Sequence, residues 1–425
     1  MKKPLFAPWP SFDHEIMDAV RGVIIFGKVS QWTGPHVYAF EKEYADYLGV
    51  KHAIAMANGS VTLDVALRVL GIGVRAGDEV VVASRSFVAS ASCVPLSGAI
   101  PVFTDVDPVS GNVTAETIRA VLTRKTKAVI VVHLAGWPCD MDPIVSLCRS
   151  KKIFLIEDCA QAHGARYKGR PVGSFGDLGS FSFCQDKIFT TGGEGGLLVT
   201  NDAALWKKAW SFKDHGRDFD AVFGRQNGTG FKWMVNSFGT NYRMTEMQAV
   251  IGRIMLKRLD GMVRARRDRA RTLDRAFKDM PGLKVTVPSK DCYHAYYKYH
   301  VRVDPEALKP GRTRDWILKE LSSRGIPCGI GSCPEIYREK AFQTFRKKLS
   351  YPPQERLPEA KKWGETSLMF LVHPTLKKEC MEYVIDSMRT VLKKAVRPQY
   401  RSISPEIGAV PTAINRKKIK VRTVK

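Results

Sequence analysis

The sequence predicts an α/β fold in which a mostly parallel, mixed sheet is covered by helices on both faces and is followed by a smaller α+β domain. Between residues 79 and 156, continuous apolar runs of strand length alternate with segments of helical periodicity. That alternation is typical of parallel strands buried on both faces. After residue 158, short strand-like runs follow one another closely, which indicates that part of the sheet is reached without helical crossovers.

The first clear helix is expected to begin at Gly59 and Ser60. Leu63, Ala66 and Leu70 then fall on one face, and Gly71 stands where a C-terminal glycine belongs. Beyond it the predicted strands and helices alternate. Strands are expected at 79–83, 100–103, 128–132 and 153–156, and the helices between them at 88–96, 115–122 and 143–148.

Two more short strands are expected at 180–184 and 197–200. A second strong helix begins at Thr245, because Thr245-Glu246-Met247-Gln248 matches a capping box and an apolar stripe follows it. We expect this helix to continue to about residue 277. The smaller unit then has a predicted strand at 298–303 and a predicted helix at 313–324.

These elements predict three parts of the chain. Residues 1–254 form a large domain, 255–395 a small C-terminal domain and 396–425 a basic tail. Roughly the first 30 residues are expected to pack on the small domain.

Composition narrows the class of protein. With 425 residues, 44% of them hydrophobic, the chain can bury a sizeable core, and no apolar run reaches the length of a membrane span. The N-terminal MKKPLFAPWP has no apolar stretch behind its lysines, so it does not resemble a secretory signal. Nine irregularly spaced cysteines without a C-x-x-C pair favour reduced thiols. We therefore expect a cytoplasmic protein.

The net charge of +25 suggests a polyanionic partner: nucleic acid, an anionic membrane surface or a phosphorylated substrate. Positive charge rises in the tail, where residues 396–425 contain eight Lys or Arg and one Glu. The tail has no aromatic residue besides Tyr400 and no recognition-helix pattern. We interpret it as a solvated extension and not as a nucleic-acid-binding arm.

Two residues suggest the chemistry. Lys187 follows the predicted strand at 180–184, and Asp158 follows the apolar run Ile153-Phe154-Leu155-Ile156. A lysine amine can form a Schiff base with an aldehyde cofactor. A carboxylate can keep the pyridine nitrogen of pyridoxal phosphate protonated, so that the ring acts as an electron sink. The pair is therefore a candidate pyridoxal-phosphate site.

Other features could complete this site. The helix beginning at Gly59 and Ser60 offers unpaired amides and the positive end of its dipole to a phosphate. Phe87 follows the strand at 79–83 and could lie against a planar ring, although an ordinary core phenylalanine is the alternative. A metal site at Asp158 and His163 is not favoured, since their spacing matches no common ligand set. The run of glycines at 71–77 precedes a strand, so it is a loop and not a dinucleotide fingerprint.

In combination, the motifs resemble the DegT/StrS family of pyridoxal-phosphate sugar aminotransferases, which have the fold type I architecture. The resemblance runs from about Trp32 to about Pro374. It rests on these motifs: Asn58-Gly59-Ser60, Glu157-Asp158-Cys159-Ala160-Gln161-Ala162-His163-Gly164, the run from Ser182 to Gly196, and Gly239-Thr240-Asn241-Tyr242-Arg243-Met244.

The resemblance implies roles for single residues. Lys187 would form the Schiff base and move the proton, Asp158 would pair with the pyridine nitrogen, and Gln161 would contact the ring hydroxyl.

The phosphate would be held by Ser182 and by the amides of Gly59 and Ser60. Phe87 would stack on the ring. Asn241 would reach across a homodimer interface to the neighbouring cofactor, so that the two subunits share their active sites.

The implied reaction is transfer of an amino group, with L-glutamate as donor, to a keto group of a nucleotide-linked deoxy- or keto-hexose in surface polysaccharide or glycoside biosynthesis. The basic charge suits a nucleotide diphosphate, and Lys28, His215 and Arg217 are candidate contacts to it. Three alternatives remain open. They are a sugar dehydratase of the same fold, in which histidine replaces the lysine, a nucleic-acid-binding regulator using the tail, and an enzyme acting on a small amino acid.

Overall fold

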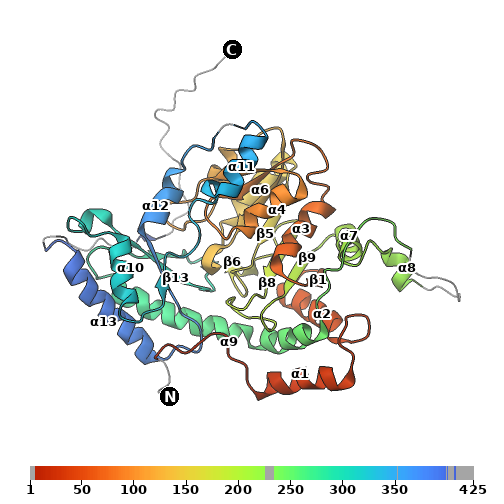
Figure 1. The fold of residues 1–425 in the computed structure, drawn as a ribbon, viewed down its shortest axis with the longest axis horizontal. Coiled ribbons are helices and arrows are strands. Elements are labelled where there is room, and N and C mark those ends of the chain that lie inside the picture. Colours follow the sequence, from red (N-terminus) through yellow and green to blue (C-terminus); the bar gives the residue numbers. More distant parts are fainter. Residues whose placement is uncertain (1–4, 225–233, 352, 399, 401–405, 408–425) are drawn as a thin grey trace, which may run out of the picture.

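A seven-stranded sheet forms the centre of the larger of two domains (Figure 1). The computed structural model describes residues 5–224, 234–351, 353–398, 400 and 406–407. The strand order is β1-β9-β8-β5-β4-β2-β3, and β9 alone among these seven strands runs against the others. The strands are β1 (His52–Met56), β2 (Glu79–Ala83), β3 (Ile100–Thr104), β4 (Thr126–Val132), β5 (Phe154–Asp158), β8 (Leu178–Ser182) and β9 (Gly196–Thr200).

Helices cover both faces of this sheet, as predicted. Alternate residues of β2 show why the strand is apolar throughout. Val80 and Val82 pack with α3 and α4, whereas Val81 and Ala83 pack with α5 and α6. The helices of this domain are α2 (His36–Leu48), α3 (Gly59–Val69), α4 (Ala89–Ser97), α5 (Ala115–Arg119), α6 (Met141–Lys151), α7 (Ala203–Lys213) and α8 (Phe219–Phe223), with the short η1 (Leu134–Gly136).

The predicted strands and helices of this domain are confirmed, with small shifts at their ends. The helix expected at 115–122 ends at Arg119, and the strand expected at 180–184 lies at 178–182. Gly71 has a φ of 71°, the left-handed conformation expected after a helix. Strand β1 was not anticipated, because two of its five residues His-Ala-Ile-Ala-Met are alanines, which are depleted in strands.

Helix α9 (Glu246–Phe277) connects the two domains without a break. It begins with the predicted capping box, in which the Thr245 and Gln248 side chains each bond the other's backbone amide. Its first half packs on α2, and Leu273 and Phe277 near its end belong to the core of the small domain. The predicted boundary at residue 254 falls inside this helix, and the division into domains stays a prediction.

The small domain is a four-stranded antiparallel sheet, in the order β10-β13-β15-β14, covered by helices. The predicted strand at 298–303 and helix at 313–324 correspond to β13 and α10. Its elements are β10 (Leu283–Lys284), β13 (Tyr299–Val303), η2 (Pro305–Ala307), α10 (Arg314–Ser322), β14 (Cys328–Gly329), β15 (Ser367–Phe370) and α13 (Lys378–Ala395). After β14 the chain returns to the large domain, where η3 (Ile336–Arg338) and α11 (Lys340–Lys348) pack beside β3, and α12 (Pro358–Thr366) leads back to β15. Two small sheets join β6 (Arg166–Tyr167), β7 (Arg170–Pro171) and β12 (Cys292–Tyr293), and β11 (Thr286–Val287) with β16 (Glu406–Ile407).

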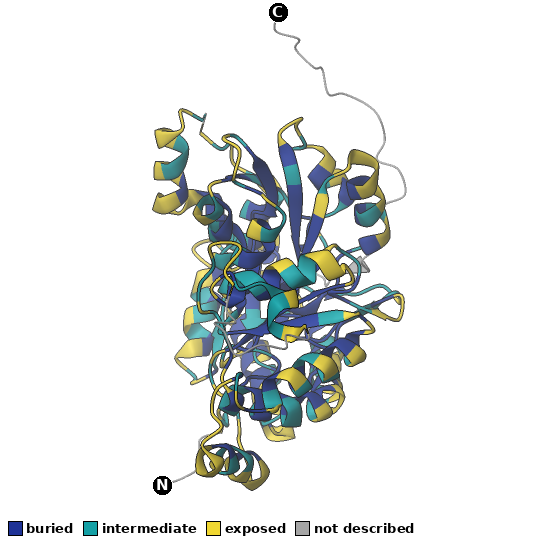
Figure 2. Cartoon of the chain, turned by 90° about the vertical axis from the view of Figure 1, so that its right-hand side faces the viewer, coloured by how far each residue is buried: buried dark blue, intermediate teal, exposed yellow. Residues whose placement is uncertain are grey.

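The N-terminal segment lies along the bottom of the molecule. Residues 5–9 contact the small domain, where the Cys380 thiol donates to the Leu5 carbonyl and Trp9 stacks on His373. Helix α1 (His14–Phe26) then packs on α9 and leaves much of its surface exposed (Figures 1 and 2). Phe26, at its end, is 80% exposed.

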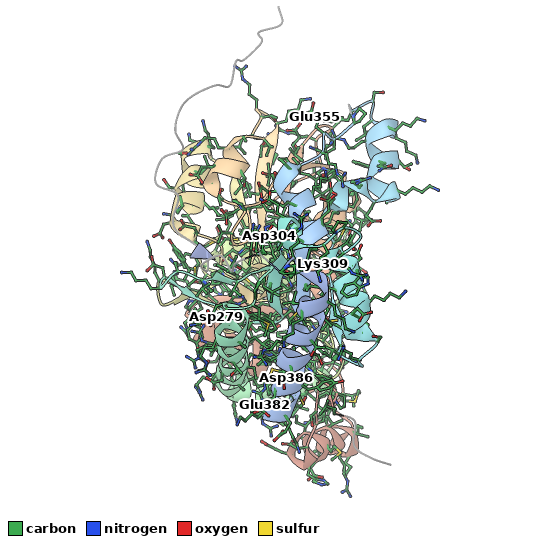
Figure 3. The ribbon with its side chains drawn as sticks, turned by 90° about the vertical axis from the view of Figure 1, so that its left-hand side faces the viewer. Asp279, Asp304, Lys309, Glu355, Glu382 and Asp386 are labelled. Atoms are coloured by element: carbon green, nitrogen blue, oxygen red, sulfur yellow. The ribbon has the colours of Figure 1, made fainter. Side chains whose placement is uncertain are left out.

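The chain beyond α13 is anchored to the small domain at its beginning. The Arg397 amide donates to the Ala307 carbonyl and its Nε to the Leu308 carbonyl. The Tyr400 hydroxyl donates to Asp304, which is labelled in Figure 3 on the small-domain side. Residues 399, 401–405 and 408–425 of the predicted basic tail lie outside the described residues. No helix in the described part of the chain is long and apolar enough to cross a membrane.

Candidate active site

One cavity of about 890 Å³ lies at the carboxyl ends of the parallel strands, where open α/β sheets bind their ligands. All but one of the predicted site residues line it. Those residues are Gly59, Ser60, Phe87, Asp158, Gln161, Ser182 and Lys187. The small domain closes the other side of the cavity, with Tyr297, Lys298, His300, Gly331, Ser332, Cys333 and Met369.

Asp158, the last residue of β5, is a buried carboxylate that is 4% exposed. Its Oδ2 accepts a hydrogen bond from the Ser90 hydroxyl at 2.7 Å, and its Oδ1 accepts one from the Ala160 amide at 3.0 Å. Burial raises the pKa of Asp158, although these two hydrogen bonds and the charge of Lys187 oppose the shift. A cationic ring nitrogen placed beside it would remove the cost of burying its charge.

Lys187 stands on the loop between β8 and β9. Its Nζ donates to Oδ1 of Asp186 at 3.1 Å, and Asp186 also accepts a hydrogen bond from the Tyr297 hydroxyl. Burial opposes ionisation of Asp186, but the charge of Lys187 and these hydrogen bonds together lower the pKa of that carboxyl. Asp186 of this loop thus holds the amine, while the ring of Tyr297 from the small domain lies 5.3 Å from the ammonium.

The start of α3 and the end of β8 touch beside this amine. A Cβ added to Gly59 would lie 2.5 Å from the Ser182 Cβ, so only glycine permits the approach. Asn58 caps the helix, and its Oδ1 accepts from the Ser60 amide at 3.0 Å and from the Val61 amide at 3.1 Å. An anion bound here must therefore share or displace the Asn58 cap before it can use the Ser60 amide.

Two further predicted side chains, those of Gln161 and Phe87, line the wall of the cavity. Gln161 Oε1 accepts from the Ala135 amide at 2.8 Å, which fixes the orientation of its side chain. Phe87 is 61% exposed although its neighbours line the cavity. The alternative of an ordinary core phenylalanine is therefore wrong, and its ring is available to a planar ligand.

The remaining predicted residues lie elsewhere. Asn241 does not line the cavity: its backbone bridges Asp214 and its Oδ1 accepts from the Arg243 amide at 3.3 Å. Lys28, His215 and Arg217 do not line it either. A site built from one chain thus leaves these four residues unused.

The two buried histidines beside the cavity are engaged in hydrogen bonds within the protein. His163 Nε2 bonds the Ser182 carbonyl and its Nδ1 the Tyr44 hydroxyl, both at 2.7 Å, and burial lowers its pKa to about 3. His133, Glu157 and Cys159 come within 4.8 Å of one another. There Nδ1 of His133 accepts from the Cys139 amide, so Nε2 carries the proton and faces Glu157. A protonated nitrogen cannot bind a metal.

Sequence reasoning missed the contributions of Ser90 and of the small domain. Ser90 is the second residue of α4 and had no distinguishing motif. The small-domain residues lie just before or at the start of β13, whose sequence has no motif that indicates a site. They are Tyr297, Lys298 and His300. Only the packing of the second domain over the strand ends brings them to the cavity.

Comparison with known proteins identifies the family. The model of the DegT/DnrJ/EryC1/StrS aminotransferase family matches residues 10–389. The chain belongs to this family. This aminotransferase is 41% identical to GDP-perosamine synthase of Caulobacter vibrioides over 295 residues, 69% of this chain and 75% of that one. It is 33% identical to the spore coat polysaccharide biosynthesis protein SpsC of Bacillus subtilis, over 93% of this chain and 99% of that one.

A solved structure extends the match to the fold. The aminotransferase from Psychrobacter cryohalolentis superposes with a TM-score of 0.87 at 49% sequence identity, covering 92% of this chain and 99% of that one. The predicted fold type I architecture is thereby confirmed.

Aminotransferases of this family depend on pyridoxal phosphate, and the residues of this aminotransferase fit that cofactor. Asp158 is a buried carboxylate facing the cavity, where a pyridine nitrogen needs one. The Gly59–Ser182 contact forms a cradle at a helix N-terminus that a side chain would fill. Phe87 offers an exposed ring, and Lys187 an amine. The individual roles of these residues stay predictions.

Proposed function

We propose that this aminotransferase moves an amino group from L-glutamate to a keto group of a nucleotide-linked hexose, in the biosynthesis of a surface polysaccharide or glycoside. The observation that supports it most is the lysine amine of Lys187 in the same cavity as the buried carboxylate of Asp158. The names of the two curated relatives, one a GDP-perosamine synthase and one a polysaccharide biosynthesis protein, support the sugar substrate.

The cofactor, when bound, supplies a protonated ring that withdraws electrons from the carbon bearing the transferred nitrogen. Asp158 holds a negative charge at the end of β5, where the ring nitrogen needs it. Lys187 takes the proton from the α-carbon of the donor through its Nζ and returns a proton on the acceptor side. Between these transfers, Asp186 accepts a hydrogen bond from the Lys187 ammonium and so keeps it at the cavity.

The size of the cavity suits two ligands. Pockets for small ligands range from about 300 to 1,000 Å³, and this one has about 890 Å³. A cofactor and a hexose fit together in that volume. The net charge of +25 favours approach of the anionic diphosphate.

We further propose that two copies of the chain form a homodimer with shared active sites. Asn241 and the other three residues outside the cavity would then serve the site of the partner subunit. The exposed apolar side chains of α1 support an interface at that end of the molecule; they are Met17, Ile24, Ile25 and Phe26.

Two alternatives are weaker. A sugar dehydratase of this fold would have histidine at position 187, where this chain has lysine. A regulatory role in nucleic-acid binding would rest on the tail, of which Arg397 and Tyr400 are engaged with the small domain.

Absorbance spectroscopy tests the proposal. The protein reconstituted with pyridoxal phosphate should show the visible band of lysine-bound cofactor, lose it with L-glutamate and regain it with the correct keto-sugar nucleotide. Lys187→Ala should lack the band and the turnover. Undiminished amino transfer by Lys187→Ala would refute the assignment.

A further inference from the structure

The cavity contains a second amine, that of Lys298. Lys298 precedes β13 of the small domain, whereas Lys187 belongs to the large domain. Both ammonium groups face the ring of Tyr297, Lys187 at 5.3 Å and Lys298 at 4.7 Å from its centroid. The two amines therefore lie on opposite domains but beside one aromatic ring.

The carboxylate of Asp186 is already occupied. Its Oδ1 accepts from Lys187 and its Oδ2 from the Tyr297 hydroxyl. Among the described residues, no carboxylate lies within 4.0 Å of the Lys298 ammonium. Lys298 is thus a half-buried cation that faces a cavity and has no ion-pair partner in the described part of the chain.

Arg266 adds to this excess of positive charge. It is 2% exposed, lies on α9 and donates from Nη1 to the Tyr297 carbonyl at 3.1 Å. Its buried Nε and Nη2 have no hydrogen-bond partner among the described residues. A buried cation without a counter-ion is costly unless an anion binds beside it. The Arg266 guanidinium, which lies 5.1 Å from the centroid of the Trp9 ring, thus makes the region around Tyr297 electropositive and favours an anion in the adjacent cavity.

The position of Lys298 indicates which anion. The amine of the donor must reach the position of the Lys187 amine, because the two amines bond in turn to the same carbon of the cofactor. In an α-amino acid, the carboxylate is attached to the carbon that bears the amine. Lys298 lines the same cavity and shares the Tyr297 ring with Lys187, so it is placed to meet that carboxylate. The anion cradle for a phosphate lies instead at Gly59 and Ser182, on the large domain.

We propose that Lys298 binds the α-carboxylate of the amino donor and thereby selects α-amino acids over simple amines. This inference rests on the proposed transfer from an amino acid, and it adds a specificity residue from the small domain. Lys298 binds and orients the donor, while proton transfer belongs to Lys187.

The charge state of Lys298 gives the binding a pH dependence. Burial, with the charges of Arg266 and Lys187 and against the opposing charge of Asp186, lowers the pKa of Lys298 to about 8. Donor affinity should therefore fall as the pH rises above about 8. The titratable and charged groups that face Lys298 are Asp186, Lys187, Arg266, Tyr297, His300 and His373.

The test compares two donors that differ in one group. L-Glutamate and 4-aminobutyrate share an amine and a distal carboxylate, and only glutamate has the α-carboxylate. Loss of the cofactor band is followed with each donor in the reconstituted wild-type protein, Lys298→Gln, Lys298→Arg and the control Lys42→Gln, whose lysine is exposed on α2. Lys298→Gln should raise the apparent Kd for glutamate by about 10- to 100-fold and leave the reaction with 4-aminobutyrate and the KM of the sugar nucleotide unchanged.

A direct binding measurement supplements the kinetics. Calorimetric titration with glutarate, which has two carboxylates and no amine, should show weaker binding to Lys298→Gln and wild-type affinity in Lys42→Gln. Lys298→Arg should retain glutarate binding but lose its decline above pH 8, since arginine stays charged.

Other results would overturn the inference. Equal losses with glutamate and 4-aminobutyrate would make Lys298 a general structural residue. An effect confined to the sugar nucleotide would assign it to the acceptor. Failure of the proposed function appears differently: wild-type protein would not react with glutamate, although glutarate binding would still depend on Lys298. Glutarate binding that is as strong in Lys298→Gln as in the wild type would refute the proposal.

Discussion

Gly59 at the start of α3 and Ser182 at the end of β8 approach so closely that a Cβ on Gly59 would lie 2.5 Å from the Ser182 Cβ and 3.0 Å from its Cα. The contact joins the helix N-terminus to the strand end from which the Lys187 loop departs. The backbone of Ser182 cannot move aside without moving β8.

Gly59→Ala should therefore weaken both the fold and the cofactor site. Overpacking of this kind costs about 1–3 kcal/mol, and the displaced Ser182 should lower the affinity for pyridoxal phosphate. Thermal unfolding and cofactor titration measure the two effects. Gly22→Ala in α1 is the matched control, because nothing lies within 4 Å of its added Cβ. Equal behaviour of the two variants would contradict the prediction.

Asp158→Asn should separate stability from function. Burial raises the pKa of Asp158 in the folded protein, so its contribution to stability is present at low pH and is lost as the pH rises through the raised pKa. Asparagine carries no charge that must be buried at neutral pH. The cofactor-free variant should thus melt no lower than the wild type at neutral pH, while turnover falls by about 100-fold or more. A variant that melts earlier but transaminates normally would contradict both halves.

Glu157 should prove structural and independent of metal. Its carboxylate accepts from the amides of Gly173, Phe175 and Gly176 at 2.7–2.8 Å and from His133 at 3.1 Å. In Glu157→Gln the side-chain NH₂ would face these donors, at a cost of about 3 kcal/mol in the free energy of unfolding.

The control for Glu157→Gln is Asp46→Asn, which breaks the exposed pair with Lys42 and should leave the melting temperature unchanged. Chelators should not alter the melting temperature of the wild type. A drop in stability on metal removal would show that His133, Glu157 and Cys159 bind an ion after all.

Subunit mixing tests the shared site. Lys187→Ala and Asn241→Ala should each be inactive, or nearly so, as separate proteins. If the two subunits share their sites, refolding them together in equal amounts should restore about a quarter of the wild-type sites, because half of the dimers pair one of each. Turnover of the mixture against the two parents measures this. No recovery in a mixture that forms heterodimers would assign Asn241 to its own chain.

The beginning of the tail should matter for stability and the end should not. Truncation after Tyr400 retains the bonds of Arg397 to Ala307 and Leu308, whereas truncation after Ala395 removes them. The shorter protein should lose about 1–2 kcal/mol, and the longer one should melt and turn over like the full chain. Polyanion binding should be measured on the full chain and on both truncated proteins. Binding by the full chain that is lost on truncation after Tyr400 would favour a second role for the terminal residues.

The sequence predicts the parts of the site that lie within one domain. Strong apolar runs end at Asp158 and near Ser182, and parallel strand ends meet at one edge, so these residues come together from pattern alone. Helix α9 was predictable because its capping box and apolar stripe are local features.

The rest depends on contacts between distant segments. Nothing near Lys298 shows that the small domain covers the strand ends, since a strand sequence does not say which cavity its first residue faces. The competition between Asn58 and a phosphate for the Ser60 amide also needed coordinates, although asparagine before a helix is a frequent cap. Strand β1 escaped notice because its two alanines weaken the local pattern, and only its pairing with β9 shows it to be a strand.

The unbroken course of α9 has a consequence for motion. At 1.5 Å per residue its 32 residues make a rod of about 48 Å. Near one end, Gln248 donates to the Glu194 carbonyl in the loop that holds Lys187, and farther along Arg266 donates to the carbonyl of Tyr297. A hinge motion between the domains would have to bend this helix or break both hydrogen bonds. Substrate should therefore enter through rearranged loops while the two domains keep their relative positions.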